Sequence, residues 1–478
     1  MSKSISLSSP PMGSRRVSLD SCREQDASAS ELDAQSINSI ENQKTNPELK
    51  KGAYHFFSPE IAHLRAAYLK PLVMVIVLII ITQWAFITLY FGSLSHNPTF
   101  VPQLRGLLID RDGSEFGSAM VSAFTENVSG ANGVGKHHLG WKIISASQYP
   151  TNEAVAQAVV EEKAWVAVVV GTGATAKLAA ARQHGDASYN PGSAVTVYYN
   201  QARNEQASGN YIVPLTTTLV NQTLTQYSLQ STAKYIAQVG ANSTAWALLG
   251  QAPQTLVTPV SYTMVNVRPY TTPVAAAMTL VGQIYIIIFG FVITMAGYGL
   301  RAQIAPYLTM RSYMAFRLFA PFLAYVVVSF SYTMIDLPFK VPFDAKFSYA
   351  GGFFITWLFM LMGMTALGFA TEAMITILGP NFMAFFLLPL IISNIAVASV
   401  PIDLQPWIYR YGYGFPVYNL GIAIRTIIFN THSHMGRNAG VLIAWIALSM
   451  GTITVFTYLT ERRTRAAIAS DQEKAAST

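Results

Sequence analysis

Six long apolar segments stand out in the pattern of hydrophobic and polar positions, and they are unevenly spaced along the chain. The first covers residues 72–91 (LVMVIVLIIITQWAFITLYF) and contains no charged residue. The largely polar residues 92–272 separate it from the other five, which are 275–298, 318–337, 349–371, 382–400 and 439–459. A helix needs about 20 apolar residues to cross the hydrocarbon of a bilayer. The pattern therefore predicts a polytopic α-helical membrane protein with six transmembrane helices, one before and five after a large insertion.

The remaining residues predict how the chain divides into domains. Its N-terminal part is rich in Ser, Asn and Gln, which is typical of a disordered tail. Ser58 followed by Pro59 is a helix-start signal. The predicted parts are a disordered cytosolic tail (1–57), an interfacial helix with the first span (58–91), an extracytoplasmic domain (92–272), the five other spans (273–460) and a second cytosolic tail (461–478).

The inserted residues alternate between short apolar runs and helical patterns. Strands are expected at four places, namely 104–110, 139–145, 165–170 and 194–200. Strands that alternate with helices are typical of a mainly parallel α/β sheet. Residues 206–239 are also expected to be helical, with an interruption at Pro214, and 256–268 to be extended.

Two signals give the spans a direction. Lys and Arg gather near one set of span ends, at Lys50, Lys51, Arg65, Lys70, Arg301, Arg311, Arg317, Arg462, Arg463 and Arg465. Because such residues favour the cytosolic side, both termini are expected in the cytosol. Three Asn-X-Ser/Thr sequons, at Asn127, Asn221 and Asn242, all fall within 92–272. They predict N-glycosylation and a lumenal or extracellular inserted domain.

Composition agrees with membrane integration and narrows the partners. The chain is 51% apolar and 12% charged, as expected where backbone polar groups are satisfied inside lipid-embedded helices. The net charge of +7 comes from the expected cytosolic span ends, where membrane lipid is the natural partner. The inserted domain has no basic patch that would indicate nucleic-acid binding. Cys22 is the single cysteine, so no disulfide is expected.

The N-terminal tail contains one candidate modification site. Arg15 and Arg16 precede Ser18 in the pattern that basophilic kinases favour. A phosphate on Ser18 would reset the local charge. A chance match in a Ser-rich tail is the alternative.

Two short patterns resemble nucleotide-binding loops but lack residues that such loops need. Residues 130–137 (GANGVGKH) have His137 where a phosphate loop has Ser or Thr for magnesium. Residues 171–176 (GTGATA) follow a strand and open a helix, but no acidic residue follows at the distance of a dinucleotide fingerprint. A strand-to-helix turn explains them better. No nucleophile–base pair or metal cluster is evident, so neither an enzyme nor a cofactor is expected.

Several segments, in the right order, resemble known membrane proteins. Residues 106–120 (GLLIDRDGSEFGSAM), 139–145 (LGWKIIS) and 152–177 (NEAVAQAVVEEKAWVAVVVGTGATAK) resemble the outer domain of bacterial phage-infection-protein-like permeases. Those permeases are related to the membrane domains of type-2 ABC exporters. Residues 273–291 (PVAAAMTLVGQIYIIIFGF) and 405–444 (QPWIYRYGYGFPVYNLGIAIRTIIFNTHSHMGRNAGVLIA) resemble the fungal nitrosoguanidine-resistance family.

This resemblance implies a multi-pass protein of the plasma membrane, or of an endomembrane, that contributes to resistance to toxic compounds. It also implies an outer re-entrant segment at 401–438. The chain has no complete phosphate loop, so a separate ATPase or an ion gradient would supply the energy, with the cytosolic loop 301–317 as the place where an ATPase docks.

Charged residues at membrane depth are candidates for a transport path, because they are expensive there. Glu372 is either a proton-linked carboxylate or a carboxylate at the cytosolic mouth of the fourth span. Asp336 lies at the end of the third span, where a helix terminator in the interface is the alternative. Arg425 lies in 418–429, which is too short to cross. It either contacts lipid phosphate or an anionic substrate, or it pairs with Asp403.

Small residues four apart on the last span permit close contact between helices, within the fold or in a homo-oligomer. They are Gly440 with Ala444 and Ala447 with Gly451.

Three functions are compatible with the sequence. The first is a permease-like exporter of lipophilic or toxic small molecules. The second is a non-transporting regulator of lipid arrangement or of other transporters. The third is a receptor-like protein that captures a ligand through its outer α/β domain.

Overall fold

The structure, a computed structural model, describes residues 53–130, 135 and 137–477. By its internal contacts the chain divides into two units, Met1–Val77 and Leu78–Thr478. The first unit contains the 3-10 helix η1 (Pro59–Ile61), which begins at the predicted start signal, and the first part of helix α2 (Ala62–Thr82). All elements from α3 (Thr88–Ser95) onward belong to the second unit.

Five helical stretches in the described part of the chain are long and apolar enough to cross a membrane. They are Pro59–Ser95, Ala277–Tyr307, Met310–Met334, Tyr349–Leu378 and Met435–Thr464. They coincide with five of the six predicted spans, and the chain is a mostly helical, membrane-resident protein with one small sheet.

The remaining predicted span, 382–400, forms the shorter helix α15 (Ala384–Ala398), which contains Pro389. Its 15 residues extend about 22 Å at 1.5 Å per residue. The hydrocarbon core of a bilayer is about 30 Å thick. A sixth transmembrane helix therefore stays a prediction.

The helices that follow the sheet pack around α14 (Tyr349–Leu378). Its neighbours are α12 (Gly282–Ile304), α13 (Met310–Met334), α16 (Pro416–Phe429) and α17 (Met435–Ser477). In its most apolar window α14 is 72% buried, whereas none of the other four candidate spans exceeds 33%. Helix α14 is therefore the centre of this helix group.

Glycines bring α12 and α14 close together. A Cβ built on Gly290 would lie 3.0 Å from the Cα atom of Gly368. The contact predicted through Gly440 and Gly451 is different, since no described atom lies within 4 Å of a Cβ built on either residue. Within the described fold the small residues of the last span make no close contact, and a contact between two copies stays a prediction.

The α/β domain is built on one sheet with the strand order β2-β1-β3-β4-β5. The strands are β1 (Arg105–Asp110), β2 (Gly140–Ser145), β3 (Val166–Val170), β4 (Val195–Tyr199) and β5 (Tyr262–Asn266). Strand β1 pairs in parallel with β2 and β3, β4 runs antiparallel to β3, and β5 runs parallel to β4. The mainly parallel sheet is confirmed, and the four predicted strands agree to within one residue at each end.

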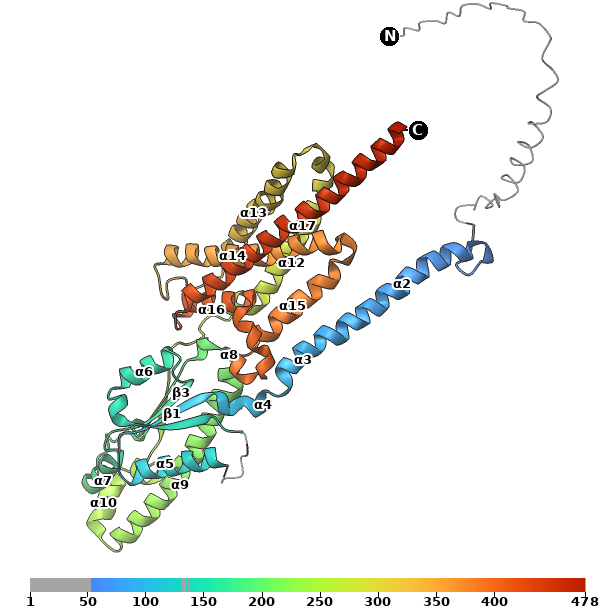
Figure 1. Ribbon diagram of the computed structural model, residues 1–478. Coiled ribbons are helices and arrows are strands. Elements are labelled where there is room, and N and C mark those ends of the chain that lie inside the picture. Colours follow the sequence, from blue (N-terminus) through green and yellow to red (C-terminus); the bar gives the residue numbers. More distant parts are fainter. Residues whose placement is uncertain (1–52, 131–134, 136, 478) are drawn as a thin grey trace, which may run out of the picture. The chain divides into compact units, whose positions relative to one another are not determined.

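Helices cover both faces of this sheet. They are α5 (Glu115–Ser129), α6 (Asn152–Val160), α7 (Ala174–His184), α8 (Glu205–Ala207), α9 (Val213–Val239), α10 (Ser243–Gln251) and α11 (Gln254–Val257). Successive side chains of a strand point to opposite faces. Leu108 therefore joins the core with α5, α7 and α9, whereas Leu107 and Ile109 pack with α6 on the other face. Figure 1 shows α6 on one side of the sheet and α5, α7 and α9 on the other.

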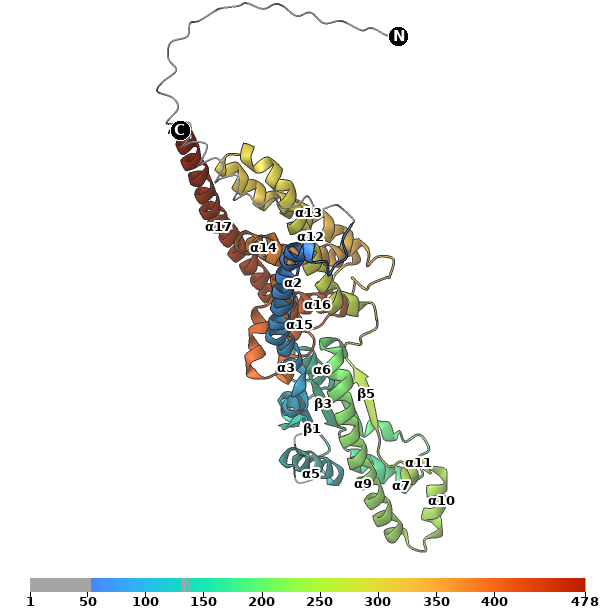
Figure 2. The same ribbon diagram turned by 90° about the vertical axis from the view of Figure 1, so that its right-hand side faces the viewer.

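The helix predicted over 206–239 is not interrupted at Pro214, and a π-helical turn precedes this proline instead. Helix α8 continues into the π-helix η7 (Ser208–Ile212) and then into α9 without a break. Pro214 occupies the first turn of α9, where a residue without an N–H donor is tolerated. The long α9 runs beside the last strand, β5 (Figure 2). The side chain of Asn221 on α9 donates a hydrogen bond to the Tyr262 hydroxyl of β5 at 3.4 Å.

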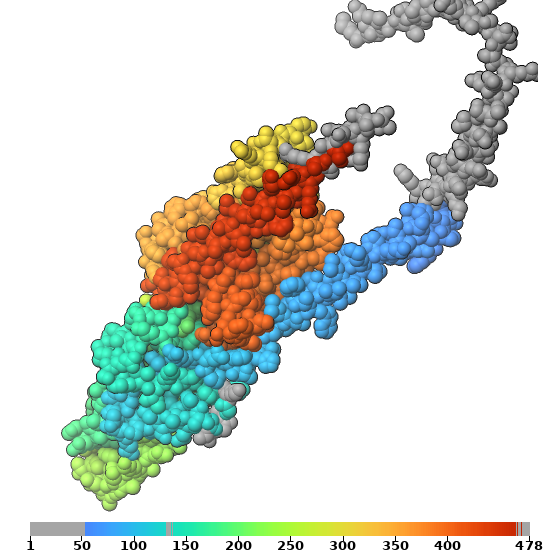
Figure 3. Space-filling model, viewed as in Figure 1, coloured from blue at the N-terminus to red at the C-terminus, as the bar shows by residue number. Residues whose placement is uncertain are grey.

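The segment between α15 and α17 connects the helix group with the α/β domain. It contains the 3-10 helices η11 (Ile402–Leu404) and η12 (Trp407–Gly414), followed by the buried helix α16. Helix α16 contacts η6 (Gln201–Arg203), which directly follows β4. In the space-filling view, this orange segment meets the α/β domain directly (Figure 3). Helix α16 has only 14 residues, and the re-entrant segment at 401–438 stays a prediction.

Candidate functional site

A cluster of three charged side chains is buried among the membrane helices. Glu372 of α14 is fully buried and accepts two hydrogen bonds from Arg301 of α12, each 2.9 Å long. Arg317 of α13 donates to the same carboxylate at 3.2 Å. These three residues, here called the charged triad, place two positive charges against one negative charge. Charges so deep in a helix group are expensive unless they are paired.

Further hydrogen bonds tie the charged triad to a fourth helix. Nη1 of Arg317 donates to Thr457 of α17 at 2.8 Å. Its Nη2 donates to Thr376 of α14 at 2.8 Å and to the carbonyl of Glu372 at 3.1 Å. The triad therefore joins α12, α13, α14 and α17 near the C-terminal end of α14.

This geometry distinguishes the two interpretations of Glu372. A proton on the carboxylate would leave two buried guanidinium groups without a counter-charge, which burial penalises strongly. Glu372 also lies behind a cavity of about 280 Å³ that Arg301 and Arg317 line. The contacts favour a fixed charge that locks four helices together over a proton carrier.

The triad also changes the interpretation of two arginines. The sequence assigns Arg301 and Arg317 to a cytosolic loop, but they are only 5% and 4% exposed. Arg311, between them, is exposed. Two of the three loop arginines are thus held by Glu372, and the surface on which an ATPase could dock is less basic than predicted.

Asp336 does not belong to the charged triad. It follows the end of α13 by two residues, and its backbone N–H donates to the carbonyl of Thr333 at 3.2 Å. Its side chain is buried, and Oδ2 has no hydrogen-bond partner within the described residues. The position agrees with a helix terminator, but the carboxylate is enclosed by protein rather than exposed in an interface.

Arg425 pairs with Glu205, and the predicted alternative of a pair with Asp403 is wrong. The guanidinium donates to both carboxylate oxygens of Glu205, with 3.2 Å between Nη2 and Oε1. Its Nη1 also donates to the carbonyl of Ala202 at 3.4 Å. The pair joins α16 to α8, and so it joins the helix group to the α/β domain.

A second set of contacts crosses the same boundary. Glu162, which follows α6, lies 3.7 Å from Nε of Arg203 and 3.2 Å from Nε2 of His434. The guanidinium of Arg203 stacks on Trp165, with its carbon 3.5 Å from the ring centroid. Glu162 also has a positive φ of 61°, a strained conformation for a residue other than glycine. These contacts and the Arg425–Glu205 pair are together called the junction.

The junction carboxylates predict a pH dependence. Burial would raise the pKa of Glu205 and of Glu162, but Arg425 for the first, and His434 and Arg203 for the second, hold both pKa values below the usual 4.5. A carboxylate with a lowered pKa in the folded state stabilises the fold above its unfolded pKa and loses that effect as the pH falls through its folded pKa. We therefore expect the junction to be stable at neutral pH and to loosen below about pH 4.5.

Hydrogen exchange in residues 201–207, corrected for its intrinsic pH dependence, measures this loosening in the purified protein. Glu205→Gln should raise exchange already at pH 7, whereas Glu126→Gln, an exposed substitution on α5, should leave it unchanged. Protection that persists in the wild type down to pH 3 would contradict the expectation.

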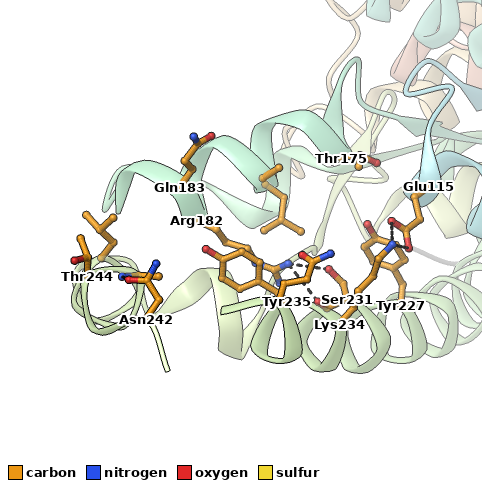
Figure 4. Close-up of a pocket in the computed structure, with 15 residues that line it drawn as sticks. Glu115, Thr175, Arg182, Gln183, Tyr227, Ser231, Lys234, Tyr235, Asn242 and Thr244 are labelled. Carbon is orange, nitrogen blue, oxygen red and sulfur yellow. Dashed lines mark hydrogen bonds and ion pairs between the residues drawn. The ribbon is translucent and has the colours of Figure 1, made fainter. Parts of the chain in front are cut away.

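A cleft of about 580 Å³ opens in the α/β domain between α7, α9 and α10 (Figure 4). Its two cations have partners. Arg182 donates to the carbonyl of Thr255 at 2.9 Å and to the hydroxyl of Ser231 at 3.0 Å, and Lys234 pairs with Glu115 at 3.0 Å. What remains open to a ligand is aliphatic and aromatic surface together with hydroxyl and amide groups, which suits an uncharged molecule with both polar and apolar parts.

The cleft begins where the parallel strands β1 and β3 end, a usual place for ligand sites in α/β sheets. A carboxylate of the chain already caps the helix there. Asp112 accepts hydrogen bonds from the backbone N–H of Thr175 at 2.9 Å and from its hydroxyl at 2.6 Å. In nucleotide-binding folds a phosphate takes that position. The geometry supports a strand-to-helix turn at 171–176.

The three sequons differ in accessibility. Asn127 is 6% exposed within α5, Asn221 is exposed on α9, and Asn242 is exposed at the start of α10. Asn242 accepts a hydrogen bond from the N–H of Ala245 through Oδ1, so its Nδ2, the atom that carries a glycan, is not used in this cap. Among the three, the geometry favours Asn242.

We expect Asn242→Gln to abolish most of the endoglycosidase-sensitive mass shift of the protein made in eukaryotic cells. Asn127→Gln is the matched control and should leave the shift unchanged, because a buried side chain has no room for a glycan. If the wild type shows no shift, the predicted lumenal or extracellular side of the domain is contradicted.

Ser18, the predicted phosphorylation site, lies outside the residues that the structure describes. Among the described residues no group of three or more His, Cys, Asp or Glu side chains is placed to hold a metal ion.

Comparison with known proteins gives a family but no activity. A family model described as "Protein of unknown function (DUF3533)" matches residues 74–451. The chain is 26% identical over 448 residues to the uncharacterized endoplasmic reticulum membrane protein YJR015W of Saccharomyces cerevisiae. The aligned residues cover 88% of this chain and 86% of the yeast protein. No solved structure matches the chain.

Proposed function

The chain belongs to this DUF3533 family, and from that premise we propose that it is a permease-like membrane protein that moves lipophilic or toxic small molecules across its membrane. It is not an enzyme in this proposal. The α/β domain faces the lumen or the exterior, and both termini face the cytosol, as the Lys and Arg distribution and the sequons suggest.

The charged triad is the observation that carries this proposal. Ionisable residues buried among transmembrane helices are rare and usually serve ion or substrate movement. Here they join four helices at one point, where a small shift of α12 or α13 against α14 would have to break hydrogen bonds to Glu372. Such a cluster can hold one state of a helix group that alternates between two arrangements.

The resemblance to nitrosoguanidine-resistance proteins and to the membrane domains of ABC exporters supports the same function. It also suggests that a separate ATPase, or an ion gradient, supplies the energy. The name of the yeast relative favours an endomembrane, whereas the resemblance to resistance proteins favours the plasma membrane. Homo-oligomer formation is compatible with either location.

The test measures release of a fluorescent lipophilic cation such as rhodamine 6G in two settings. Cells with and without the protein report on a system that contains every partner. Proteoliposomes that contain only the purified protein, with and without a proton gradient, report on the protein alone. Faster release in both settings indicates transport driven by a gradient, and faster release only in cells indicates a partner ATPase. Equal release with and without the protein in both settings rejects the proposal.

The cleft in the α/β domain supports a second function, the capture of an uncharged polar ligand. Tyr235 and Ser231 on its wall suit a neutral oligosaccharide. Thermal-shift titration with a panel of neutral oligosaccharides tests this function. Tyr235→Ala should lose any stabilisation that the wild type shows, whereas Leu229→Ala, an exposed substitution on α9, should retain it. The same response from Tyr235→Ala and the wild type would reject the second function.

A further inference from the structure

A cavity of about 260 Å³ lies at the junction between the α/β domain and the helix group. A water molecule in the liquid takes about 30 Å³, so the cavity has the volume of about eight or nine water molecules. It is called here the junction cavity. Thr279 and Arg437, from the first turns of two candidate spans, contribute to its wall. The junction cavity therefore lies at the level where a bilayer passes from hydrocarbon to headgroups.

One side of the junction cavity carries positive charge that is held in place. Arg203 is flat against Trp165, and Glu162 fixes its Nε edge. A guanidinium held in this way offers its remaining N–H groups in a fixed orientation, which favours a phosphate. Arg437 also lines the cavity, and within the described residues it has no hydrogen-bond or ion-pair partner.

The wall of the same cavity also carries a negative charge, that of Asp403, next to aromatic rings. Asp403 lines the cavity, is half-buried, and within the same described residues has no hydrogen-bond or ion-pair partner. Tyr413 and Tyr418 also line the cavity, with their ring centroids 5.7 Å apart and their planes at 90°. A carboxylate with two tyrosine rings at right angles suits an ammonium group, since cations bind to aromatic faces.

Arginine side chains and a carboxylate that form no direct ion pair with each other line one cavity, which suits a ligand that carries both charges. We propose that the junction cavity binds a phosphate ester that also carries an ammonium group, as the headgroup of a zwitterionic phospholipid does. Arg203 and Arg437 bind the phosphate, and Asp403 with Tyr413 and Tyr418 binds the ammonium group. Arg425 is already paired with Glu205 and holds the wall in place. The inference goes beyond transport, because headgroup binding can be measured without it.

Native mass spectrometry of the full-length protein in detergent tests this inference. Synthetic phosphatidylcholine and phosphatidylglycerol are added separately, and the fraction of protein with one bound lipid is measured. We expect the wild type to retain phosphatidylcholine more strongly. Asp403→Asn should weaken the binding of phosphatidylcholine roughly fivefold, as expected for the loss of one charge-assisted contact. The same substitution should leave the binding of phosphatidylglycerol unchanged. Arg437→Gln should weaken the binding of both lipids by a similar factor.

Two matched variants control for the change in charge. Asp344→Asn and Arg311→Gln remove exposed charges that do not line the cavity, and both should bind like the wild type. Equal binding by all variants, or stronger wild-type retention of phosphatidylglycerol than of phosphatidylcholine, overturns the inference. If Asp403→Asn loses lipid but still releases dye like the wild type, the site stands and transport is independent of it.

A competition experiment identifies the source of the ligand. Soluble phosphocholine is added to the protein loaded with phosphatidylcholine. If phosphocholine displaces the lipid, the headgroup alone provides the binding, and a soluble ester can be the ligand. If the lipid is retained, its acyl chains contribute to binding, and the ligand is a membrane lipid. Both results support the site, and only the variants decide whether it exists.

Discussion

Glu372→Gln should have the largest effect of any single substitution in this protein, namely the loss of most folded material. The change leaves Arg301 and Arg317 buried without a counter-charge. Removal of one partner from a buried ion cluster typically costs about 3–5 kcal/mol. Since folded proteins are stable by only about 5–15 kcal/mol, we expect a large fall in monodisperse protein by fluorescence-detected size exclusion and a lower unfolding temperature for what remains.

A triple variant shows whether Glu372→Gln destabilises the protein because two buried arginines lose their counter-charge or because the packing of the side chains changes. Arg301→Met, Arg317→Met and Glu372→Leu together remove all three charges and keep most of the volume. Buried ion clusters replaced by apolar side chains are often neutral or more stable, so the triple variant should be recovered better than Glu372→Gln. Asp344→Asn controls for the loss of an exposed carboxylate. A Glu372→Gln protein as stable as the wild type would show that the charged triad does not hold the helices together.

If the triple variant folds, it becomes the sharper probe of transport. It keeps the packing of α12, α13 and α14 but lacks the hydrogen bonds that must break when these helices move. Dye release unchanged in a folded triple variant would assign the triad to stability alone. Altered release would assign it to the transport cycle.

Local sequence patterns predicted the fold of the α/β domain well, for a physical reason. The run 166–170 (VAVVV) is buried on both faces, and such runs are typical of central strands in parallel sheets. The strand and the flanking turns are encoded within a few residues of each other. The same holds for the start of η1 at Pro59, where one residue supplies the helical φ angle.

The charged residues were predicted less well, because their partners are distant in sequence. Arg425 pairs with Glu205, which is 220 positions away, and the sequence offered only the nearby Asp403. Arg301 and Arg317 looked like surface charges at the cytosolic ends of spans. Whether such an arginine points to lipid, water or a buried carboxylate depends on how the helices rotate against each other, and hydropathy alone does not encode that rotation.

The contact between α12 and α14 was also missed, although small residues mark it. Neither Gly290 nor Gly368 has a Gly or Ala four positions away, whereas the last span has Gly and Ala four positions apart. The pattern of small residues four positions apart therefore predicted a close helix contact at α17 instead. The neighbouring helices decide which small residue is covered, and Gly368 is covered both by α12 and by Tyr325 of α13.

Gly368→Ala should consequently destabilise the helix group by about 1–3 kcal/mol, as overpacking of a tight core does. A Cβ at this position would overlap the ring of Tyr325, which is fully buried and has no room to turn away. Alanine favours a helix over glycine by about 1 kcal/mol, so the steric effect must exceed that gain to be seen. We expect a lower unfolding temperature in detergent and weaker contact between α13 and α14.

Gly451→Ala is the matched control, because the same substitution there meets open space. It should be neutral or slightly stabilising through helix propensity alone. Tyr325→Leu, which removes the ring that a Cβ would strike, should restore part of the stability of Gly368→Ala when the two are combined. If Gly368→Ala and Gly451→Ala have the same unfolding temperature, or if the double variant is no more stable than Gly368→Ala, the ring of Tyr325 does not pack tightly against Gly368.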